Sequence, residues 1–199
     1  MADWRRKDAI CTVSGKVIRP LEPSSNDIAI EDIAHALANS CRFTGHTTSF
    51  YSVAQHSVLV SEFVEARAMM EWAATEQEVP GLCLWSLLHD GSEAYLSDIA
   101  RPIKRFQGDF GKIYGEIEEN LMKAIAEKFD LPWPMPEVVG HADLVVFNAE
   151  VRDLMPDHDV FNRWIEEASE IWPPKITPWP PVEARNQFLW RYEKLNDLR

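Results

Sequence analysis

An apolar run that ends in two adjacent polar groups is the feature that most constrains how this chain can fold. Residues 84–99 read LWSLLHDGSEAYLSDI, so His89 and Asp90 directly follow a nearly continuous apolar stretch. A polar group that is buried without a partner costs on the order of 1–3 kcal/mol, and a charged one costs more. The fold must therefore bring compensating groups to this pair from elsewhere in the chain.

Most of the chain is patterned for helices. Apolar residues recur at spacings of three and four, and this periodicity predicts helices within residues 24–40, 51–66, 82–97, 113–129, 137–155 and 182–198. Residues 9–22 predict a short β-hairpin that turns at Ser14-Gly15. Segments 41–50 and 100–111 are predicted loops, and the Pro-rich segment 172–181 is predicted to be extended. The expected fold class is mainly α, with a small β-hairpin at the N-terminus.

Composition narrows the possible classes of function. A chain of 199 residues suits one domain, and its net charge of −12 argues against general nucleic-acid binding, which needs a basic face. No apolar run approaches the roughly 18 residues of a membrane span, and the N-terminus lacks the apolar region of a signal peptide. The three cysteines are widely spaced, which indicates neither a disulfide framework nor a Cys-rich zinc site. We expect a cytoplasmic protein with no membrane or nucleic-acid partner.

Two more polar residues lie in apolar surroundings, as the His-Asp pair does. His56 falls on an apolar stripe with Val53, Val60 and Phe63. A single His of this kind is more often a core residue bonded to a backbone carbonyl than a ligand. Asp143 lies within VVGHADLVVFNAEV, where a lone carboxylate would be costly without a partner. Three predicted helices thus each bring a His or an Asp to an inner face.

These groups form a plausible metal site. Two imidazoles and two carboxylates suit one divalent transition metal such as Zn, Mn, Co or Fe, and the four residues are His56, His89, Asp90 and Asp143. The alternative, four separately satisfied core residues, must explain three buried exceptions at once. Glu93 follows Asp90 by three positions, so on a continuous helix it would lie over the same wedge of the surface.

The ordered set of His, His-Asp and Asp resembles the HD-domain metal-dependent phosphohydrolases. The resemblance rests on Arg42-Phe43 and on the motifs SVAQHS, LLHDGSEAYLSDIARPIK and HADLVVFNAEVRDL, and it covers roughly residues 30–155. It extends equally to the bacterial HD-type 5′-deoxynucleotidases and to the phage-type HD dATP triphosphohydrolases. It implies a single HD helical domain over 1–199, with an N-terminal hairpin extension 1–29, a core 30–155 and a C-terminal Pro/Trp-rich segment and helix 156–199.

The resemblance also implies catalytic roles. The two His and two Asp residues would ligate the metal, and Glu93 would orient or deprotonate the water that attacks phosphorus. Asp98 matches an aspartate near the sugar, although an N-cap of the following turn is an equally good interpretation.

The positive groups are candidates for binding the substrate. Arg42 matches the arginine that meets phosphate or sugar, and Lys104 could meet phosphate. The alternative for Lys104, with Arg101 and Arg105, is a solvated basic loop. His46, beside Arg42, could also touch phosphate, although a loop His is more often exposed to solvent.

The resemblance predicts a phosphohydrolase of deoxynucleotides, first a 5′-nucleotidase that converts deoxynucleoside 5′-monophosphates to nucleoside and phosphate. A dNTP triphosphohydrolase that releases tripolyphosphate is the close alternative, favoured if a basic residue beyond Lys104 reaches the site. A nucleotide-binding regulator without turnover is a third possibility, but it would not need Glu93. Phe43 stands where the prototype deoxynucleotidase has Trp, and an aromatic ring there can still crowd a 2′-hydroxyl. Family analogy suggests a homo-oligomer, a dimer or larger.

Overall fold

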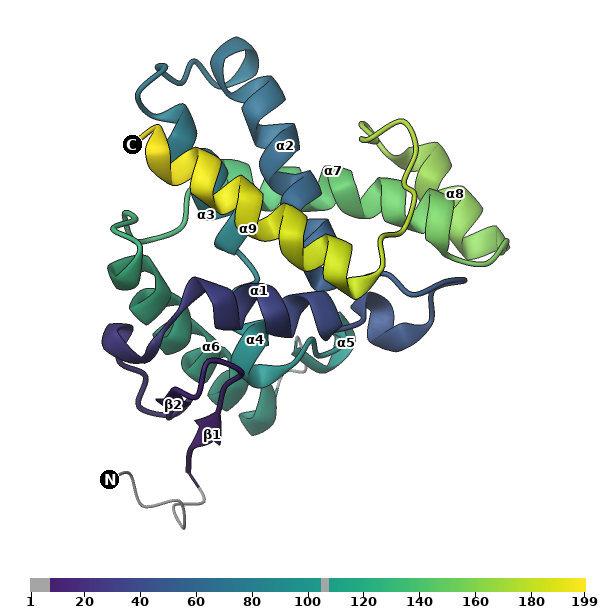
Figure 1. The fold of residues 1–199 in the computed structure, drawn as a ribbon. Coiled ribbons are helices and arrows are strands. Elements are labelled where there is room, and N and C mark those ends of the chain that lie inside the picture. Colours follow the sequence, from purple (N-terminus) through teal and green to yellow (C-terminus); the bar gives the residue numbers. More distant parts are fainter. Residues whose placement is uncertain (1–7, 105–107) are drawn as a thin grey trace.

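Helices dominate the structure. The computed structural model describes residues 8–104 and 108–199, so Arg105 lies outside the described residues. Figure 1 shows the helices, which are α1 (Ile30–Asn39), α2 (Val53–Glu71), α3 (Val79–Leu88), α4 (Glu93–Leu96), α5 (Arg101–Lys104), α6 (Asp109–Lys128), α7 (Glu137–Leu154), α8 (Asp159–Glu167) and α9 (Pro181–Asp197), together with the 3-10 turns η1 (Ser25–Asp27) and η2 (Arg42–Gly45). The prediction of a mainly α fold is confirmed.

The predicted N-terminal hairpin is also confirmed. Strands β1 (Ile10–Cys11) and β2 (Val17–Ile18) pair antiparallel, with Ile10 opposite Ile18. Gly15 has a φ of 83°, a left-handed conformation that glycine adopts without steric cost. The turn is tied to α1, because the backbone N–H and the hydroxyl of Ser14 donate to the Asp32 carboxylate at 2.9 and 2.7 Å.

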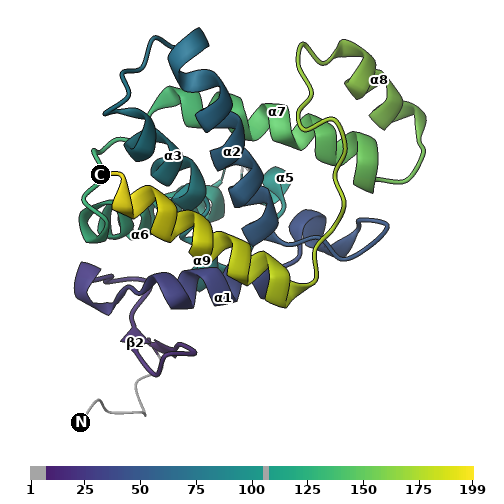
Figure 2. The ribbon, with the colours of Figure 1, turned by 45° about the horizontal axis from the view of Figure 1, so that its top comes forward.

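Helix α2 lies at the centre of the fold. Ser52 caps it, since its hydroxyl oxygen accepts the N–H of Gln55 at 3.2 Å. The helix contacts α1, α3, α7 and α9, and every residue from Val53 to Ser61 is buried. Figures 1 and 2 show α9 crossing the outer side of α2 while α7 passes on the other side. His56 therefore has no solvent exposure, as its place on the apolar stripe predicts.

The C-terminal helix α9 packs along α1, α2 and α3. Phe188 is fully buried in the core, and the buried Arg191 guanidinium donates to the backbone carbonyl of Ser61 at 2.9 Å. The extended Pro-rich segment before α9 is held by Gln55, whose side chain donates to the Thr177 carbonyl at 2.9 Å and accepts from the Trp179 N–H at 2.7 Å. Gln55 is the neighbour of His56, so this segment supports the first turn of α2.

The expected continuous helix over 82–97 is wrong. The helix ends at Leu88, and residues 89–92 form turns before α4 begins at Glu93. Gly91 explains the break, because its N–H bonds the Leu88 carbonyl at 2.8 Å and a Cβ there would lie 2.9 Å from that same oxygen. The tight turn, rather than a helical wedge, therefore decides how Glu93 is placed relative to Asp90.

Four other features differ from the sequence analysis. Part of the predicted basic loop is the short helix α5, and part of the predicted loop 41–50 is the 3-10 turn η2. Helix α8 was not predicted, although Val160, Phe161 and Trp164 recur at helical spacing; these side chains line a cavity rather than the core. Helix α6 has apolar residues at every fourth position, but they are not all buried. Ile113 is 55% exposed, whereas Leu121 and Ile125 lie in the core. Within 8–104 and 108–199, no helix has both the length and the apolar character to cross a membrane.

We propose that α9 belongs to one cooperative folding unit with the rest of the domain. Phe188→Ala should lower the free energy of unfolding by about 3–5 kcal/mol, because it leaves a cavity in the core. Trp190→Ala, on the same helix but 56% exposed, should change it by about 0.5 kcal/mol or less. Urea unfolding followed by circular dichroism measures both, and equal effects of the two changes would contradict the proposal.

Candidate metal centre and active site

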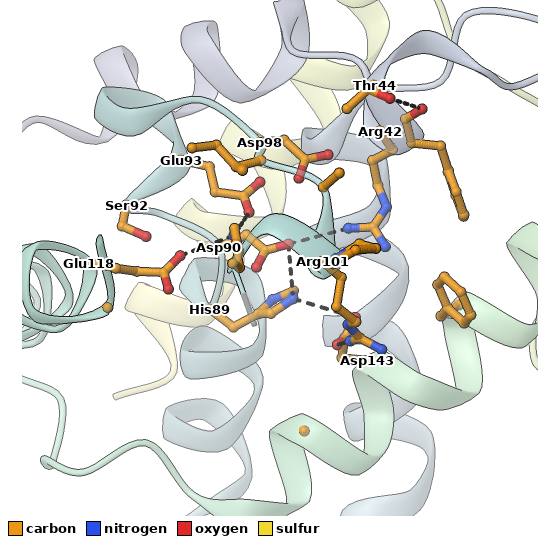
Figure 3. A pocket seen from close by; sticks show the side chains of 18 of the residues that line it. Arg42, Thr44, His89, Asp90, Ser92, Glu93, Asp98, Arg101, Glu118 and Asp143 are labelled. Carbon is orange, nitrogen blue, oxygen red and sulfur yellow. Dashed lines mark hydrogen bonds and ion pairs between the residues drawn. The ribbon is translucent and has the colours of Figure 1, made fainter. Parts of the chain in front are cut away.

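The structure brings the predicted site residues together. Nine of the ten line one cavity of about 970 Å³, and the tenth, His56, is buried behind it. The residues come from η2 and the residue after it, from α2, from the turn after α3, from the segment that runs from α4 through α5, and from α7. Figure 3 shows His89, Asp90 and Asp143 pointing toward one another, with Glu93 and Asp98 on the side of Asp90.

Two imidazoles and a carboxylate converge at the base of this cavity. His56 Nε2 and His89 Nε2 lie 3.2 Å apart, and Asp90 Oδ2 lies 3.7 and 3.3 Å from them. One ligand atom from each of these residues falls within 4.8 Å of the others, a separation that one ion can bridge. Asp143, from α7, adds a fourth donor, because its Oδ1 lies 3.1 Å from His56 Nε2 and 4.0 Å from His89 Nε2.

Hydrogen bonds on the far side of each ring fix which nitrogen faces the cluster. His89 Nδ1 lies 2.7 Å from the Ser86 carbonyl, which can only accept, so Nδ1 carries the proton. His56 Nδ1 lies 2.7 Å from Glu150 Oε1 and donates to this carboxylate. In the neutral rings, both Nε2 lone pairs therefore point into the cluster. Two imidazole nitrogens and two carboxylate oxygens are the donor set of a borderline divalent metal, and the residues fit such an ion.

The electrostatics of the cluster favour positive charge at its centre. Burial opposes a charged His89, but the charges of Asp90 and Asp143 outweigh burial and raise the pKa of its imidazole to about 9. Burial would raise the pKa of the Asp90 carboxyl, yet the neighbouring histidines and Arg42 hold it well below its usual range. Without a cation, protons on the imidazoles offset the carboxylate charge. A metal ion would take the place of these protons, and its binding would release them.

Glu150 is a functional candidate that the sequence analysis missed. It is fully buried on α7, seven residues after Asp143, and its two oxygens have different partners. Oε1 accepts from His56, and Oε2 accepts from Arg42 at 2.9 Å, while Arg42 also lies 3.5 Å from Asp90. Burial disfavours the charged form, but Arg42 and His56 outweigh it and lower the pKa of Glu150. The sequence did contain a signal for Glu150. It lies two helical turns after Asp143 in the same apolar run, so both carboxylates are expected on one face of the helix.

Glu93 is held beside the cluster in an almost fully buried position. Its Oε1 accepts from Lys104 at 2.6 Å, and Lys104 also donates to Glu118 on α6 at 3.0 Å. Burial, followed by the charge of Asp90, raises the pKa of Glu93 to about 8 despite the nearby Lys104. Glu93 Oε2 is buried and has no hydrogen-bond partner among the described residues. An acceptor left free in this way is suited to bind a water or a substrate group.

The other predicted residues occupy different parts of the cavity. Lys104 is engaged with two carboxylates, so the alternative of a solvated lysine does not describe it. His46 is exposed at the rim of the cavity. Asp98 is half-buried in the cavity wall, and among the described residues no backbone N–H donates to it, so the N-cap alternative has no support here. Phe43 has a φ of 53°, an uncommon conformation for a bulky residue, and its ring stacks on Phe147 at 5.6 Å.

Comparison with known proteins agrees with this arrangement. The family described as 5′-deoxynucleotidase YfbR-like matches residues 42–139. "Uncharacterized protein YfdR" of Escherichia coli K12 is 38% identical over 192 residues, which cover 96% of this chain and 97% of that protein. This chain belongs to the YfbR-like 5′-deoxynucleotidase family. "Uncharacterized protein RCAP_rcc00048" of Rhodobacter capsulatus is 39% identical over 145 residues, 70% of this chain and 64% of that protein.

The family match and the geometry cover different parts of the site. Residues 42–139 include Arg42, His56, the His89-Asp90 pair and Glu93, and they stop before Asp143. Asp143 and Glu150 join the site through α7, which packs on α2. A metal-dependent hydrolase of the HD superfamily is the class that both the family and the donor set support.

We expect Glu150→Gln to weaken metal binding by about 10- to 100-fold, because the bond that orients a ligand imidazole is weakened. Titration calorimetry with Mn²⁺ or Co²⁺ measures this change in affinity. His89→Ala, which removes a metal ligand, shows how much affinity is lost when a ligand itself is absent. Asp153→Asn is the matched control, since Asp153 is another buried carboxylate on α7 that pairs with Arg152 away from the cluster. It should leave metal affinity unchanged. Equal affinity of Glu150→Gln and the unmodified protein would show that Glu150 has no role in positioning.

Proposed function

We propose that this protein is a metal-dependent 5′-deoxynucleotidase that hydrolyses deoxynucleoside 5′-monophosphates to nucleoside and phosphate. The observation that carries the proposal is a pair of features in one cavity. Two imidazoles and two carboxylates converge there, and beside them lies a buried glutamate with one free oxygen. A binding protein without turnover would have no need for such a glutamate.

The metal site and Glu93 have separate tasks. When bound by His56, His89, Asp90 and Asp143, a divalent ion of the Mn, Co, Zn or Fe class supplies Lewis-acid polarisation of phosphate and water. Glu93 Oε2 accepts a hydrogen bond from the attacking water and takes its proton. Lys104 holds the other oxygen of Glu93 in place at 2.6 Å. Burial and the charge of Asp90 raise the pKa of this carboxyl, and a bound cation would oppose that rise and favour the ionised form that accepts a proton.

Arg42 and Phe43 orient the substrate in this proposal. Glu150 fixes the Arg42 guanidinium at 2.9 Å, so the arginine enters the site pre-oriented toward the phosphate oxygens. The strained backbone at Phe43 aims its ring into the cavity wall, where it packs against deoxyribose and crowds a 2′-hydroxyl. Asp98, which also lines the cavity, is assigned to the sugar in this proposal.

The charge of the cavity favours a monophosphate. Among the described lining residues, six carboxylates stand against three cations, so a substrate with fewer negative charges meets less repulsion. One observation favours the triphosphate alternative. Arg101 lies 3.5 Å from Asp143 Oδ2 and is half-exposed in the same cavity, so it is a basic residue beyond Lys104 within reach of extra phosphates.

A substrate panel separates these candidates. With Mn²⁺ or Co²⁺ we expect free phosphate from dAMP, a slower reaction with AMP and little reaction with dATP. Malachite-green detection of phosphate and anion-exchange analysis of products provide the readout, and a chelator should abolish turnover reversibly. Intact tripolyphosphate from dATP, with no phosphate from dAMP, would replace the proposal by the triphosphohydrolase. Tight nucleotide binding without any product would favour a regulator.

Glu93→Gln should separate catalysis from stability. Loss of the base should reduce turnover by about 10²–10⁴-fold while metal content is retained. The raised pKa means that ionising Glu93 costs folding free energy, a cost that is absent below its ordinary value of 4.5 and complete above about 8. The metal-free variant should therefore melt a few degrees above the unmodified protein at pH 9 and close to it at pH 4.5. Undiminished turnover would remove Glu93 from the mechanism.

A further inference from the structure

We propose that helix α8 carries a platform on which the nucleobase of the substrate stacks, with Trp164 as its principal residue. The inference rests on the proposed function, since it assigns the base of the nucleotide to a place in the same cavity. The aromatic platform is defined here as Phe147 of α7 with Phe161 and Trp164 of α8, all of which line the cavity.

Helix α8 has an apolar face that the fold does not bury. None of its residues is buried, yet Val160, Phe161 and Trp164 all line the cavity. Spacings of one and four residues place these three side chains on one side of the helix. Trp164 is 46% exposed and Val160 57% exposed. Figure 2 shows α8 set to one side of the bundle, beside α7 and away from α9. Apolar surface gathered in a cavity rather than in the core indicates a site for an apolar or aromatic ligand group.

The indole of Trp164 is held in a fixed orientation. Its Nε1–H donates to Asn148 Oδ1 at 2.9 Å, and the Asn148 amide in turn donates to the Glu170 carbonyl at 2.8 Å. The ring of Phe147 also packs against the indole in an edge-to-face arrangement, with the ring centres 5.7 Å apart. A half-exposed ring that is already oriented loses little conformational entropy when a flat ligand stacks on it.

The platform lies at a suitable distance from the metal cluster. Phe147 follows Asp143 by four residues, slightly more than one helical turn or about 6 Å along α7. Arg101 bridges the two, because its guanidinium lies 3.5 Å from Asp143 and 5.6 Å from the centre of the Phe147 ring. Phe43 stacks on the same ring. A nucleotide whose phosphate is at the cluster would thus meet Phe43 with its sugar and α8 with its base.

The chemistry of the platform predicts how the base is recognised. The indole N–H is already committed to Asn148, and the remaining side chains of the platform are hydrocarbon, so they contact the face of a base and not its edge. Every nucleobase has a π-face, so stacking of this kind tolerates different bases. The structure therefore points to weak discrimination among the four deoxynucleotides.

The test compares substrates with and without a base. Trp164→Ala should raise KM for dAMP and dCMP roughly 5- to 150-fold, the range expected when one stacking partner is removed. The same variant should leave kcat/KM for deoxyribose 5-phosphate unchanged, because this substrate has no base. Trp164→Phe keeps an aromatic ring and should bring KM for dAMP and dCMP most of the way back to the value of the unmodified protein. Trp190→Ala, an exposed tryptophan on α9 outside the cavity, is the control and should behave like the unmodified protein.

Binding measurements distinguish failure of this inference from failure of the proposed function. Titration of the metal-loaded protein with dAMP reports stacking even if nothing is hydrolysed, and Trp164→Ala should weaken that binding. A protein that binds dAMP through Trp164 but releases no product contradicts the proposed function alone. Equal binding by Trp164→Ala and the unmodified protein overturns the platform. So does sedimentation showing that Trp164→Ala dissociates a dimer without changing nucleotide affinity, since the face would then be covered by a second copy.

Discussion

Two hydrogen bonds on the outer side of the histidine pair govern this site. The Ser86 carbonyl and the Glu150 carboxylate each accept an Nδ1–H, which leaves both Nε2 atoms facing each other at 3.2 Å. Two lone pairs this close repel unless a cation or a proton lies between them. The carboxylates of Asp90 and Asp143 add negative charge beside these lone pairs, so positive charge at the centre stabilises the cluster.

Glu150 connects the histidine pair to Arg42, on the substrate side of the cavity. A fully buried carboxylate is tolerable only when both oxygens are satisfied, and here a metal-ligand imidazole and the Arg42 guanidinium satisfy them. The same residue therefore sets the orientation of a ligand and of the predicted phosphate contact. Glu93 shows the opposite arrangement, since one of its oxygens is held by Lys104 and the other is buried without a partner. An unsatisfied atom of this kind lowers stability, and such costs are typical of functional sites.

Sequence periodicity predicted most helices and the inward placement of His56, because burial of an apolar stripe is a local property of a helix. It did not predict the break after Leu88. There, one close approach between Gly91 and the Leu88 carbonyl outweighs a helical pattern that continues to Leu96. Helix α8 was not predicted either, although apolar residues recur along it at helical spacing. In the structure this apolar face lines a cavity instead of the core.

The sequence alone determined that the chain is mainly helical and that two histidines and two aspartates lie in apolar surroundings where they need partners. It also contained the ordered motifs that indicate the family. Only the tertiary structure decided which nitrogen of each histidine faces the cluster, that Glu150 links His56 to Arg42, and that Trp164 shares the cavity with Asp143. The physical reason is the range of the interactions. Burial of a helix face follows from neighbours three and four residues away, whereas the hydrogen bond between His56 and Glu150 joins positions 94 residues apart.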